Sequence, residues 1–319
     1  MSNSRILVTG GCGFIGTHVV KALLSQGYRD ITVIDNLLNG KREFLDWIGA
    51  SSVNLLPLDI TDPRTFEVVT EGSFEACIHL AALHYIPYCD AHPMQTCRVN
   101  VEGTQNILSA CVAGGIGRFF HASTAAVYRP SDTPHHETDA LQPVDIYGIS
   151  KLSNEEQVRL AARTSDCLFA VGRLFNAVGA YETNPHLIPQ ILRRLRSSSE
   201  IEIGNLTPRR DYIHVADVAD AILAMIFGTT KSFDIRNIGS GRSYSVSEVV
   251  DCIGETKRTE IRLIPSSKYI RAVDRPVLQS NNQGMLIDYG WRPKRSLRDA
   301  IAEAIDFDRT IAPFELTSG

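Results

Sequence analysis

Short apolar runs rich in β-branched residues alternate with helix-length segments over the first 175 residues. The segments between the runs repeat apolar residues every three or four positions and end at glycine, which predicts helices. Nearly continuous apolar strands separated by helices are typical of a parallel sheet covered on both faces. The pattern therefore predicts an α/β protein with a doubly wound parallel sheet, whose strands we expect at 5–10, 31–35, 53–59, 76–82, 118–124 and 167–175.

The alternation becomes less regular after residue 175. Residues 186–199 have the pattern of a basic amphipathic helix, 200–204 that of a short strand and 215–228 that of a helix. We therefore predict two domains, a first over 1–175 and a smaller C-terminal α/β substrate-binding domain over 176–319. Some segments of the second domain are expected to return and pack on the main sheet.

Composition and charge exclude several classes of protein. The chain is 44% hydrophobic and 21% charged with a net charge of −4, so it lacks the basic excess of a nucleic-acid-binding protein. No apolar stretch approaches the roughly 18 residues of a membrane span, and the N-terminus runs into a strand pattern without the features of a signal peptide. The seven cysteines are scattered and form no C-x-x-C pair. We expect reduced thiols in a cytoplasmic protein, and no metal site.

A glycine-rich turn, "VTGGCGFIG", joins the first strand to the first helix. Gly11, Gly13 and Gly16 fit the spacing G-x-G-x-x-G, and Gly10 with the last two fits the related G-x-x-G-x-x-G. Glycine lets such a turn close tightly and bring backbone N–H groups to a pyrophosphate at a helix N-terminus. Asp35 ends the second strand, where a partner for a ribose 2′-hydroxyl is needed. The turn predicts a Rossmann domain that binds NAD.

The carboxylate of Asp35 favours NAD over NADP because it would repel a 2′-phosphate. Lys41 and Arg42 follow closely and oppose this preference. Asp59 and Ile60 come after the third strand, where an adenine edge is expected, and "HLAA" ends the fourth strand with small residues that allow a cofactor to approach.

Tyr147 and Lys151 lie four residues apart at the start of a predicted helix, and so on the same face. A tyrosine and a lysine at this spacing also occur by chance on many solvent-exposed helix faces, so the pair alone does not indicate a catalytic role. The strand at 118–124, however, ends in Ser123 and Thr124 near the predicted nicotinamide. We therefore expect a hydroxyl group, the phenol of Tyr147 and the ammonium of Lys151 to lie close together there. A phenol with a pKa near 10 must gain roughly 4 kcal/mol of preferential phenolate stabilisation to act as a base near neutral pH. We expect Lys151 and the positive nicotinamide to provide it.

At this point the chain resembles the extended short-chain dehydrogenase/reductase family, and within it the nucleotide-sugar 4-epimerases similar to UDP-glucose 4-epimerase. The resemblance covers residues 5 to about 276 in family order. It rests on "VTGGCGFIG", "DNLLNGKRE", "LPLDITD", "HLAALHYIP", "RVNVEGTQN", "HASTAAVY", "YGISK", "RLFNAVG", "RRDYIHVADVADA" and "RP" at 275–276.

The resemblance implies roles for individual residues. It implies that Thr124, Tyr147 and Lys151 are catalytic, with Tyr147 as the base. The implied substrate contacts are Ser123, Thr124, Asn176, Arg210 and Arg275, the last three at the diphosphate. The implied NAD contacts are Gly10, Gly13, Phe14, Ile15, Gly16, Asp35, Asn36, Asn39, Gly40, Asp59, Ile60, Leu80, Ala81, Ala82, His84, Asn100, Tyr147 and Lys151.

The chain departs from the family pattern around the sugar pocket. His84 replaces a lysine, Arg129 replaces a glycine, and the segments around 179–189 and 275–284 are short. The identities of the nucleobase and of the sugar in the substrate therefore stay open. UDP is implied by the resemblance alone. Arg129 is a candidate for a substrate carboxylate or simply a surface arginine.

Three hypotheses follow for the function. The first is 4-epimerisation through a 4-keto sugar. The second is another reaction on that intermediate, namely 4,6-dehydration, decarboxylation or epimerisation at another carbon. Against dehydration and decarboxylation, Ala125 and Ala126 stand where relatives carry acids. The third is a non-catalytic NAD-binding protein, which the complete Thr-Tyr-Lys set disfavours. The resemblance also implies a homodimer, paired through the segments 93–114 and 147–163.

Overall fold

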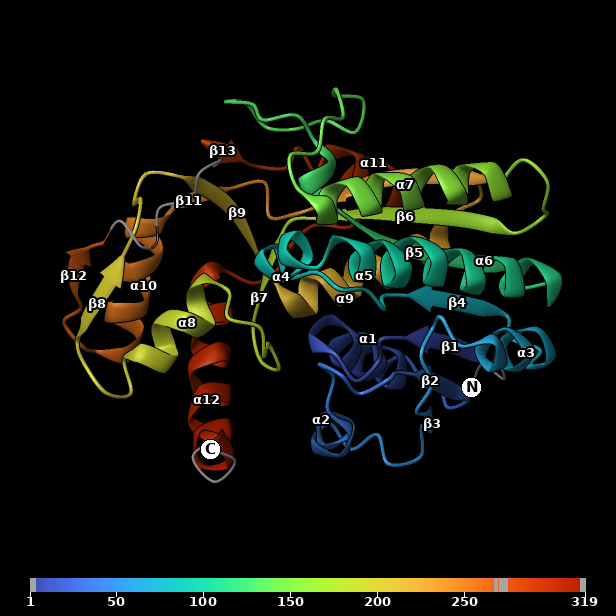
Figure 1. Ribbon diagram of the computed structural model, residues 1–319, viewed down its shortest axis with the longest axis horizontal. Helices are drawn as coiled ribbons and strands as arrows, with labels where there is room; N and C mark the ends of the chain where they lie inside the picture. Colours follow the sequence, from blue (N-terminus) through green and yellow to red (C-terminus); the bar gives the residue numbers. More distant parts are fainter. Residues whose placement is uncertain (1–3, 267–268, 270–274, 316–319) are drawn as a thin grey trace.

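The computed structural model describes residues 4–266, 269 and 275–315, and within them a seven-stranded parallel sheet forms the centre of the molecule (Figure 1). The strand order is β10-β6-β5-β4-β1-β2-β3, which places the first strand beside the fourth, as in doubly wound nucleotide-binding folds. The strands are β1 (Ile6–Thr9), β2 (Ile31–Ile34), β3 (Asn54–Leu56), β4 (Ala76–His79), β5 (Arg118–Thr124), β6 (Leu168–Leu174) and β10 (Phe233–Ile238).

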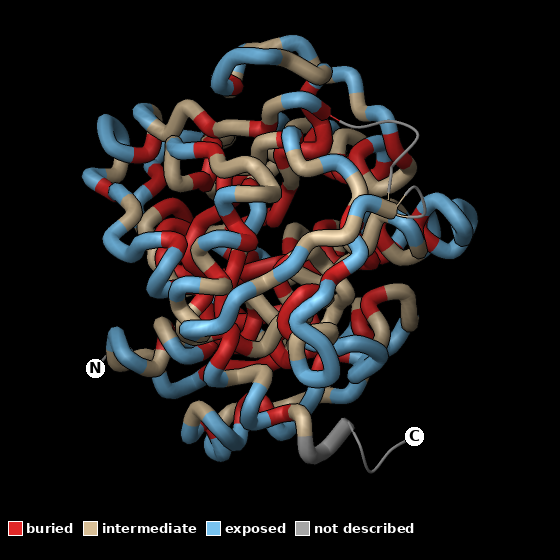
Figure 2. Tube along the Cα trace, turned by 90° about the vertical axis from the view of Figure 1, so that its left-hand side faces the viewer, coloured by how far each residue is buried: buried red, intermediate tan, exposed pale blue. Residues whose placement is uncertain are grey.

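Helices cover both faces of the sheet. On one face α1 (Phe14–Ser25) packs against α9 (Val215–Gly228), and their apolar side chains share a core with β1, β2 and β4. On the other face lie α3 (Pro63–Glu71), α6 (Gly103–Ala113) and α7 (Ile146–Ala161), over a second core. Figure 2 shows these buried segments gathered in the middle of the molecule with exposed turns around them. Because both faces are covered, the strands are rich in apolar residues on both sides.

Shorter elements surround the ends of the central strands. They are α2 (Arg42–Trp47), α4 (Ile86–Ala91), α5 (Pro93–Cys97), the π-helix η1 (Arg98–Glu102), the 3-10 turn η2 (Ala125–Val127) and α11 (Gln283–Tyr289). The π-helix leads directly into α6, and single π turns inside helices are frequent at functional sites.

The later part of the chain builds a smaller lobe, on the left in Figure 1. Within the described residues, β9 pairs with β7, β11 and β13, and β8 pairs in parallel with β12. A separate apolar core joins this lobe to the long C-terminal helix α12. The elements are β7 (Asn176–Val178), α8 (Leu187–Arg194), β8 (Glu200–Ile203), β9 (Arg209–His214), β11 (Ser243–Ser245), α10 (Val246–Lys257), β12 (Arg262–Pro265), β13 (Val277–Leu278) and α12 (Leu297–Glu315).

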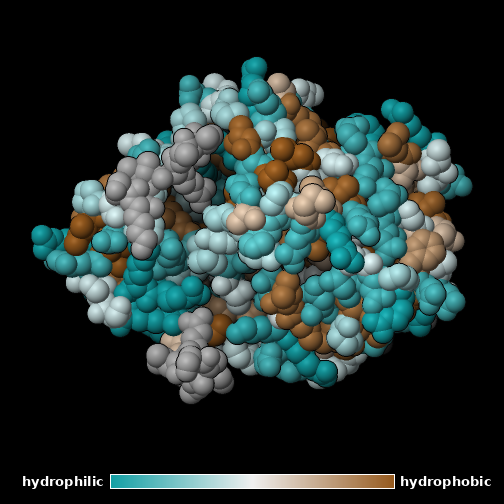
Figure 3. Space-filling view, in the orientation of Figure 1, coloured by the Kyte–Doolittle hydropathy of each residue, from teal (hydrophilic) through white to brown (hydrophobic). Residues whose placement is uncertain are grey.

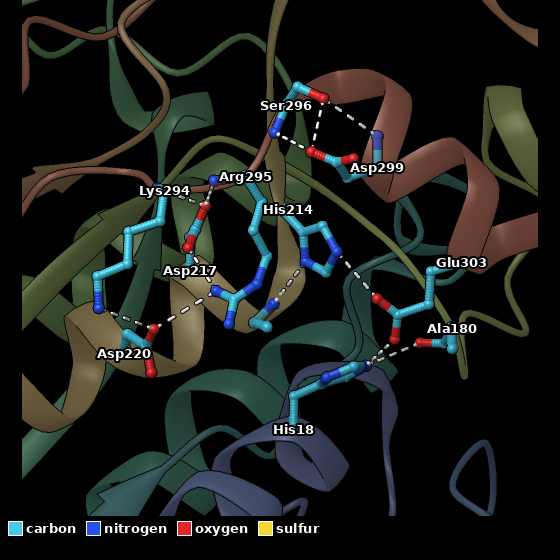
Figure 4. Close-up of polar contacts among 11 residues, drawn as sticks. His18, Ala180, His214, Asp217, Asp220, Lys294, Arg295, Ser296, Asp299 and Glu303 are labelled. Atoms are coloured by element: carbon cyan, nitrogen blue, oxygen red, sulfur yellow. Dashed lines mark hydrogen bonds and ion pairs between the residues drawn. The ribbon is translucent and has the colours of Figure 1, made fainter.

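A buried polar network fastens the two parts together (Figure 4). The carboxylate of Glu303 on α12 lies 2.9 Å from Nε2 of His214, at the start of α9, and 3.9 Å from Nε2 of His18 on α1. The same ring nitrogen of His18 lies 3.2 Å from the carbonyl oxygen of Ala180. Burial lowers the pKa of His18 to about 4, against the opposing charge of Glu303. Three elements far apart in sequence thus meet on one carboxylate.

The expected strands and helices are present, with differences at their ends. The strand predicted at 53–59 ends at Leu56, and the one predicted at 76–82 ends at His79. Residues 80–82 leave the sheet to run past the glycine turn, where Gly10 approaches Ala81. Strand β10 and helix α9 return from the second part of the chain to the main sheet, as expected, while the division at residue 175 stays a prediction. No helix in the described part of the chain is long and apolar enough to cross a membrane.

Candidate active site

The glycine turn packs so closely that side chains are excluded at two of its positions. Gly10 has a φ of +72°, and a Cβ there would lie 2.8 Å from the backbone nitrogen of Ala81. A Cβ on Gly16 would lie 2.0 Å from the carbonyl oxygen of Gly10. At Gly13, the N-cap of α1, a Cβ would meet only that same oxygen, at 3.3 Å. The helix N-terminus at Phe14 and Ile15 is thus open to a phosphate, and the cradle fits a dinucleotide.

Asp35 supports this turn from the end of β2. Its Oδ2 accepts a hydrogen bond from the Cys12 N–H at 3.0 Å, and its Oδ1 accepts one from the Leu37 N–H at 2.9 Å. Burial raises the pKa of the carboxyl, and the two backbone donors lower it in part. Gly40 packs beside it, since a Cβ there would lie 2.8 Å from the Cys12 carbonyl carbon. The backbone carbonyl of Asn39 accepts from the Thr183 hydroxyl at 3.5 Å.

The predicted adenosine residues after β2 and β3 also meet. The amide of Asn36 donates to Oδ2 of Asp59 at 2.7 Å, and Thr61 donates to Oδ1 from both its N–H and its hydroxyl. Burial alone would raise the pKa of Asp59, but these hydrogen bonds outweigh it and the pKa is lowered. Ile60, the next residue in the chain, is buried, so a carboxylate and an apolar side chain follow one another after β3.

Asn100 in the π-helix joins the end of β4 to α7. Its amide accepts from the N–H of Leu83 at 2.8 Å and donates to the carbonyl of Leu83 and to the hydroxyl of Ser150, both at 2.9 Å. Ser150 in turn donates to the backbone carbonyl of Tyr147 at 2.7 Å. The segment that begins with Leu80, Ala81 and Ala82 is therefore tied to the catalytic helix. The Asn100 side chain is committed to this link, and its direct contact with NAD stays a prediction.

The three predicted catalytic residues come together where β5 ends and α7 begins. Asp145 caps α7 by accepting from the Gly148 N–H at 2.7 Å. A Cβ on Gly148 would lie 2.7 Å from the carbonyl oxygen of Ala126, so glycine lets α7 approach the turn η2. Tyr147 is thereby brought within hydrogen-bonding reach of the Thr124 hydroxyl. Lys151 follows one turn later and is buried.

Burial governs the protonation of both groups. It raises the pKa of the Tyr147 phenol, and the hydrogen bond with Thr124 lowers it only in part. Burial also lowers the pKa of Lys151 to about 7, against the nearby Cys89 and Glu155. Without NAD, burial drives the lysine towards its neutral form, so the expectation that Lys151 and the nicotinamide together bring the phenol pKa down stays a prediction.

Ser123 lies apart from the predicted substrate groups. Its hydroxyl donates to Oε1 of Glu155 at 2.5 Å, inside the protein. Glu155 also forms a bidentate ion pair with Arg173, with distances of 2.9 and 2.8 Å, and both side chains are almost fully buried. The Ser123 hydroxyl is committed to this link, and its contact with substrate stays a prediction. Sequence reasoning missed Glu155 and Arg173, although Glu155 follows Lys151 by one helical turn.

The three groups predicted to hold a diphosphate differ in their surroundings. Arg210 donates to the carbonyl oxygen of Arg275 at 2.7 Å. The guanidinium of Arg275 is buried and donates from Nη2 to the Ala126 carbonyl at 3.0 Å and to Asp145 at 3.3 Å. Asn176 is exposed at the start of β7. The two arginines are thus neighbours, and Arg275 reaches the cap of α7, while their contact with phosphate stays a prediction.

His84 lies beside the segment that follows β7. Its Nε2 is 3.1 Å from the amide nitrogen of Asn184, and its ring stacks on His186 with 5.7 Å between centroids. Burial and then the charge of Lys151 lower the pKa of His84, so the catalytic lysine is a neighbour. Burial raises the pKa of nearby Glu182 to about 7. Arg129 is exposed.

Comparison with known proteins agrees with this geometry. Residues 6–239 match the sequence model of the NAD dependent epimerase/dehydratase family. The chain is 32% identical to the UDP-glucose 4-epimerase of Corynebacterium glutamicum, over 95% of each chain, and 32% identical to that of Rhizobium leguminosarum, over 96% of this chain and 98% of the relative.

Solved structures agree over almost the whole chain. The UDP-glucose 4-epimerase of Stenotrophomonas maltophila, determined with bound NAD and formylated UDP-arabinopyranose, superposes with a TM-score of 0.90 at 27% identity. That match covers 98% of this chain and 100% of the other. The enzyme of Thermotoga maritima with UDP-glucose gives a TM-score of 0.86 at 26% identity, over 97% and 99%. The fold, the NAD cofactor and the enzymatic nature of the chain follow from these matches.

Proposed function

Because the chain belongs to the NAD dependent epimerase/dehydratase family, we propose that it is a UDP-sugar 4-epimerase that acts through a transient 4-keto sugar. The UDP-sugar part of the proposal is supported by relatives and neighbours named for such substrates. The 4-epimerase part is supported by one feature of the site. The Thr124–Tyr147–Lys151 set is complete, while the turn that follows Thr124 carries two buried alanines, Ala125 and Ala126.

This feature separates the candidate reactions. Dehydration and decarboxylation of a 4-keto sugar require a group that moves a proton to or from carbon beside the ketone. Alanine side chains cannot transfer protons, so the positions directly after Thr124 offer no such group. Epimerisation at C4 needs a base for the C4 hydroxyl and a hydride acceptor but no such group, and the proposal assigns the base to Tyr147.

In the proposed mechanism Tyr147 removes the proton from the C4 hydroxyl and Thr124 orients that hydroxyl through its own. The glycine turn and Asp35 would hold NAD, which would supply a hydride acceptor for C4 and a positive charge beside the phenol. Lys151 shifts between its charged and neutral forms, which its pKa of about 7 permits near neutral pH. Asp145 and Gly148 hold the start of α7 against η2, so the phenol stays in place while the sugar turns over.

A single experiment tests the reaction type. The NAD-loaded protein is incubated in D₂O with UDP-glucose, UDP-N-acetylglucosamine, UDP-glucuronic acid and UDP-xylose in turn, and products are followed by NMR and mass spectrometry. We expect at least one C4 epimer, with no deuterium bound to carbon, because the C4 hydrogen never exchanges with water. Deuterium at C5 or C6, or loss of water or CO₂, would refute 4-epimerisation and favour the second hypothesis.

A further inference from the structure

Three potential metal ligands meet close to the active site without a part in the proposed reaction. His84 follows β4, and Glu182 and His186 lie four residues apart in the segment between β7 and α8. One ligand atom of each side chain lies within 4.8 Å of those of the other two. About 100 residues separate His84 from the other two, so the three form no short spacing motif in the sequence. The sequence prediction of no metal site rested on the cysteines instead.

His84 is already oriented as a metal-binding histidine would be. An amide nitrogen only donates, so Nε2 of His84 accepts from Asn184, and a metal ion would take the place of that donor at the lone pair. The proton then lies on the other ring nitrogen, which is left for the hydrogen bond with the backbone of Ala82. Histidines that bind metals commonly donate their second nitrogen to a backbone carbonyl in this way.

Glu182 is a buried carboxylate without a close ion pair. Its side chain is 8% exposed, and it accepts a hydrogen bond from the Asn184 N–H at 2.8 Å. Nε2 of His186 lies 3.8 Å from its Oε2, a loose ion pair beyond hydrogen-bonding distance. A buried carboxylate is costly unless a positive charge accompanies it, and a cation between Glu182 and the two rings would supply one.

We propose that His84, Glu182 and His186 form a binding site for a divalent cation of the Zn²⁺ class. Two imidazoles with one carboxylate are a ligand set that suits Zn²⁺, whereas Mg²⁺ and Ca²⁺ prefer oxygen alone. Tetrahedral Zn²⁺ with bonds of about 2.1 Å separates its ligand atoms by roughly 3.4 Å. The side chains must therefore close by up to about 1.4 Å, which His186 permits because it is 41% exposed. The fourth position remains for water or a ligand oxygen.

The test measures binding on the NAD-loaded protein after removal of metals with a chelator. Zn²⁺ is titrated in competition with a chromophoric chelator, and Co²⁺ is used as a spectroscopic probe. We expect one Zn²⁺ per chain with micromolar or tighter affinity, and the intense visible absorption of tetrahedral Co²⁺. Glu182→Gln and His186→Ala should each weaken Zn²⁺ binding at least ten-fold, with NAD content and circular dichroism unchanged.

His92→Ala is the matched control, because His92 is exposed and its Nδ1 contacts the Tyr88 carbonyl oxygen outside the three-ligand cluster. It should leave Zn²⁺ affinity as in the wild type. The proposal is overturned if the wild type takes up no Zn²⁺, if Mg²⁺ binds more tightly than Zn²⁺, or if the two site variants bind as well as the control. The measurement needs no turnover, so a failure of the proposed epimerase activity would not affect it.

Discussion

At the scale of single residues, the geometry of the site depends on a glycine as well as on the predicted catalytic groups. Gly148 lets the first turn of α7 rest against the Ala126 carbonyl, where any Cβ would be 2.7 Å from that oxygen. The adjacent phenol of Tyr147 consequently reaches Thr124 from a helix whose N-terminus is capped by Asp145. The site is therefore held by helix capping and close backbone packing, which keep reacting groups in a fixed geometry.

Replacing Tyr147 by phenylalanine tests its role as the base. The ring is kept, so the fold and the bound NAD should be retained, while turnover should fall by roughly 10²–10⁴-fold, as expected for loss of general base catalysis. Tyr88→Phe is the matched control, since its hydroxyl donates to Gln95 away from the catalytic residues. Steady-state rates with the best UDP-sugar measure this loss. A Tyr147→Phe rate within a few-fold of wild type would show that the phenol is not the catalytic base.

The position of Asp35 predicts the choice of cofactor. Its carboxylate is fixed by the N–H groups of Cys12 and Leu37, so it cannot swing away from an additional phosphate on the ribose. We expect cofactor-free protein to bind NAD⁺ at least ten-fold more tightly than NADP⁺, a difference of about 1.4 kcal/mol. Equilibrium dialysis with both cofactors measures it. Equal or tighter binding of NADP⁺ would mean that attraction of the 2′-phosphate by Lys41 and Arg42 outweighs its repulsion by Asp35.

Sequence could predict residues whose chemistry belongs to a motif, and it failed where burial changes the role of a residue. Asp35 lies beside the glycine turn and Tyr147 lies within hydrogen-bonding reach of Thr124, while their roles stay predictions. Arginine and glutamate in a strand and a helix are usually surface residues, so nothing pointed to the buried pair of Glu155 and Arg173. That pair takes the hydroxyl of Ser123, which the motif alone had assigned to substrate.

At the scale of elements, hydrophobic periodicity predicted which segments form strands and helices but not how they end. Strands β3 and β4 stop early, because their last predicted residues turn into the cofactor side of the sheet. The π-helix at Arg98–Glu102 has the same apolar spacing as an ordinary helix, so its extra residue per turn could not be predicted. Strand β10 is polar at Asp234 and Arg236, and its pairing with β6 makes it part of the sheet.

The central strands also predict how stability depends on pH. His79 on β4 is buried between the hydroxyls of Thr9 and Thr104, and His121 and Lys151 face it from β5 and α7. Burial, then Lys151, lowers the pKa of His79 from its ordinary 6.5 to about 3. A depressed pKa gives stability that is present above pH 6.5 and lost as the pH falls through the folded value, because the unfolded chain binds the proton first.

We therefore expect the free energy of unfolding to fall as the pH drops from 6.5 to 4, and His79→Gln to reduce that slope by up to about 1.4 kcal/mol per pH unit. Urea unfolding followed by circular dichroism at pH 7, 6 and 5 measures it. His92→Gln, at an exposed histidine, should keep the wild-type slope. Parallel slopes for wild type and His79→Gln would show that this histidine is not titrated on unfolding.

At the scale of the whole molecule, apolar side chains remain on the face formed by α5, α6 and α7. Met94 is 82% exposed on α5, and Ile149 and Leu160 on α7 are 50% and 58% exposed. In Figure 3 brown and tan side chains interrupt the polar surface in this region. A surface hollow beside them is lined by residues of α5, the π-helix and α6, with Phe66 at its edge. These helices belong to the segments 93–114 and 147–163, through which a homodimer is predicted.

Met94→Glu should disrupt this dimer, because a two-fold axis places each interface residue in both halves and the charge is introduced twice. We expect wild-type protein to sediment at twice 35.2 kDa and the variant to shift towards 35.2 kDa in a concentration-dependent way. Ile287→Glu is the matched control, since Ile287 is 77% exposed on α11, outside the two segments. It should leave the dimer intact. A wild-type mass of 35.2 kDa at every concentration, or equal dissociation of both variants, would contradict pairing through α5, α6 and α7.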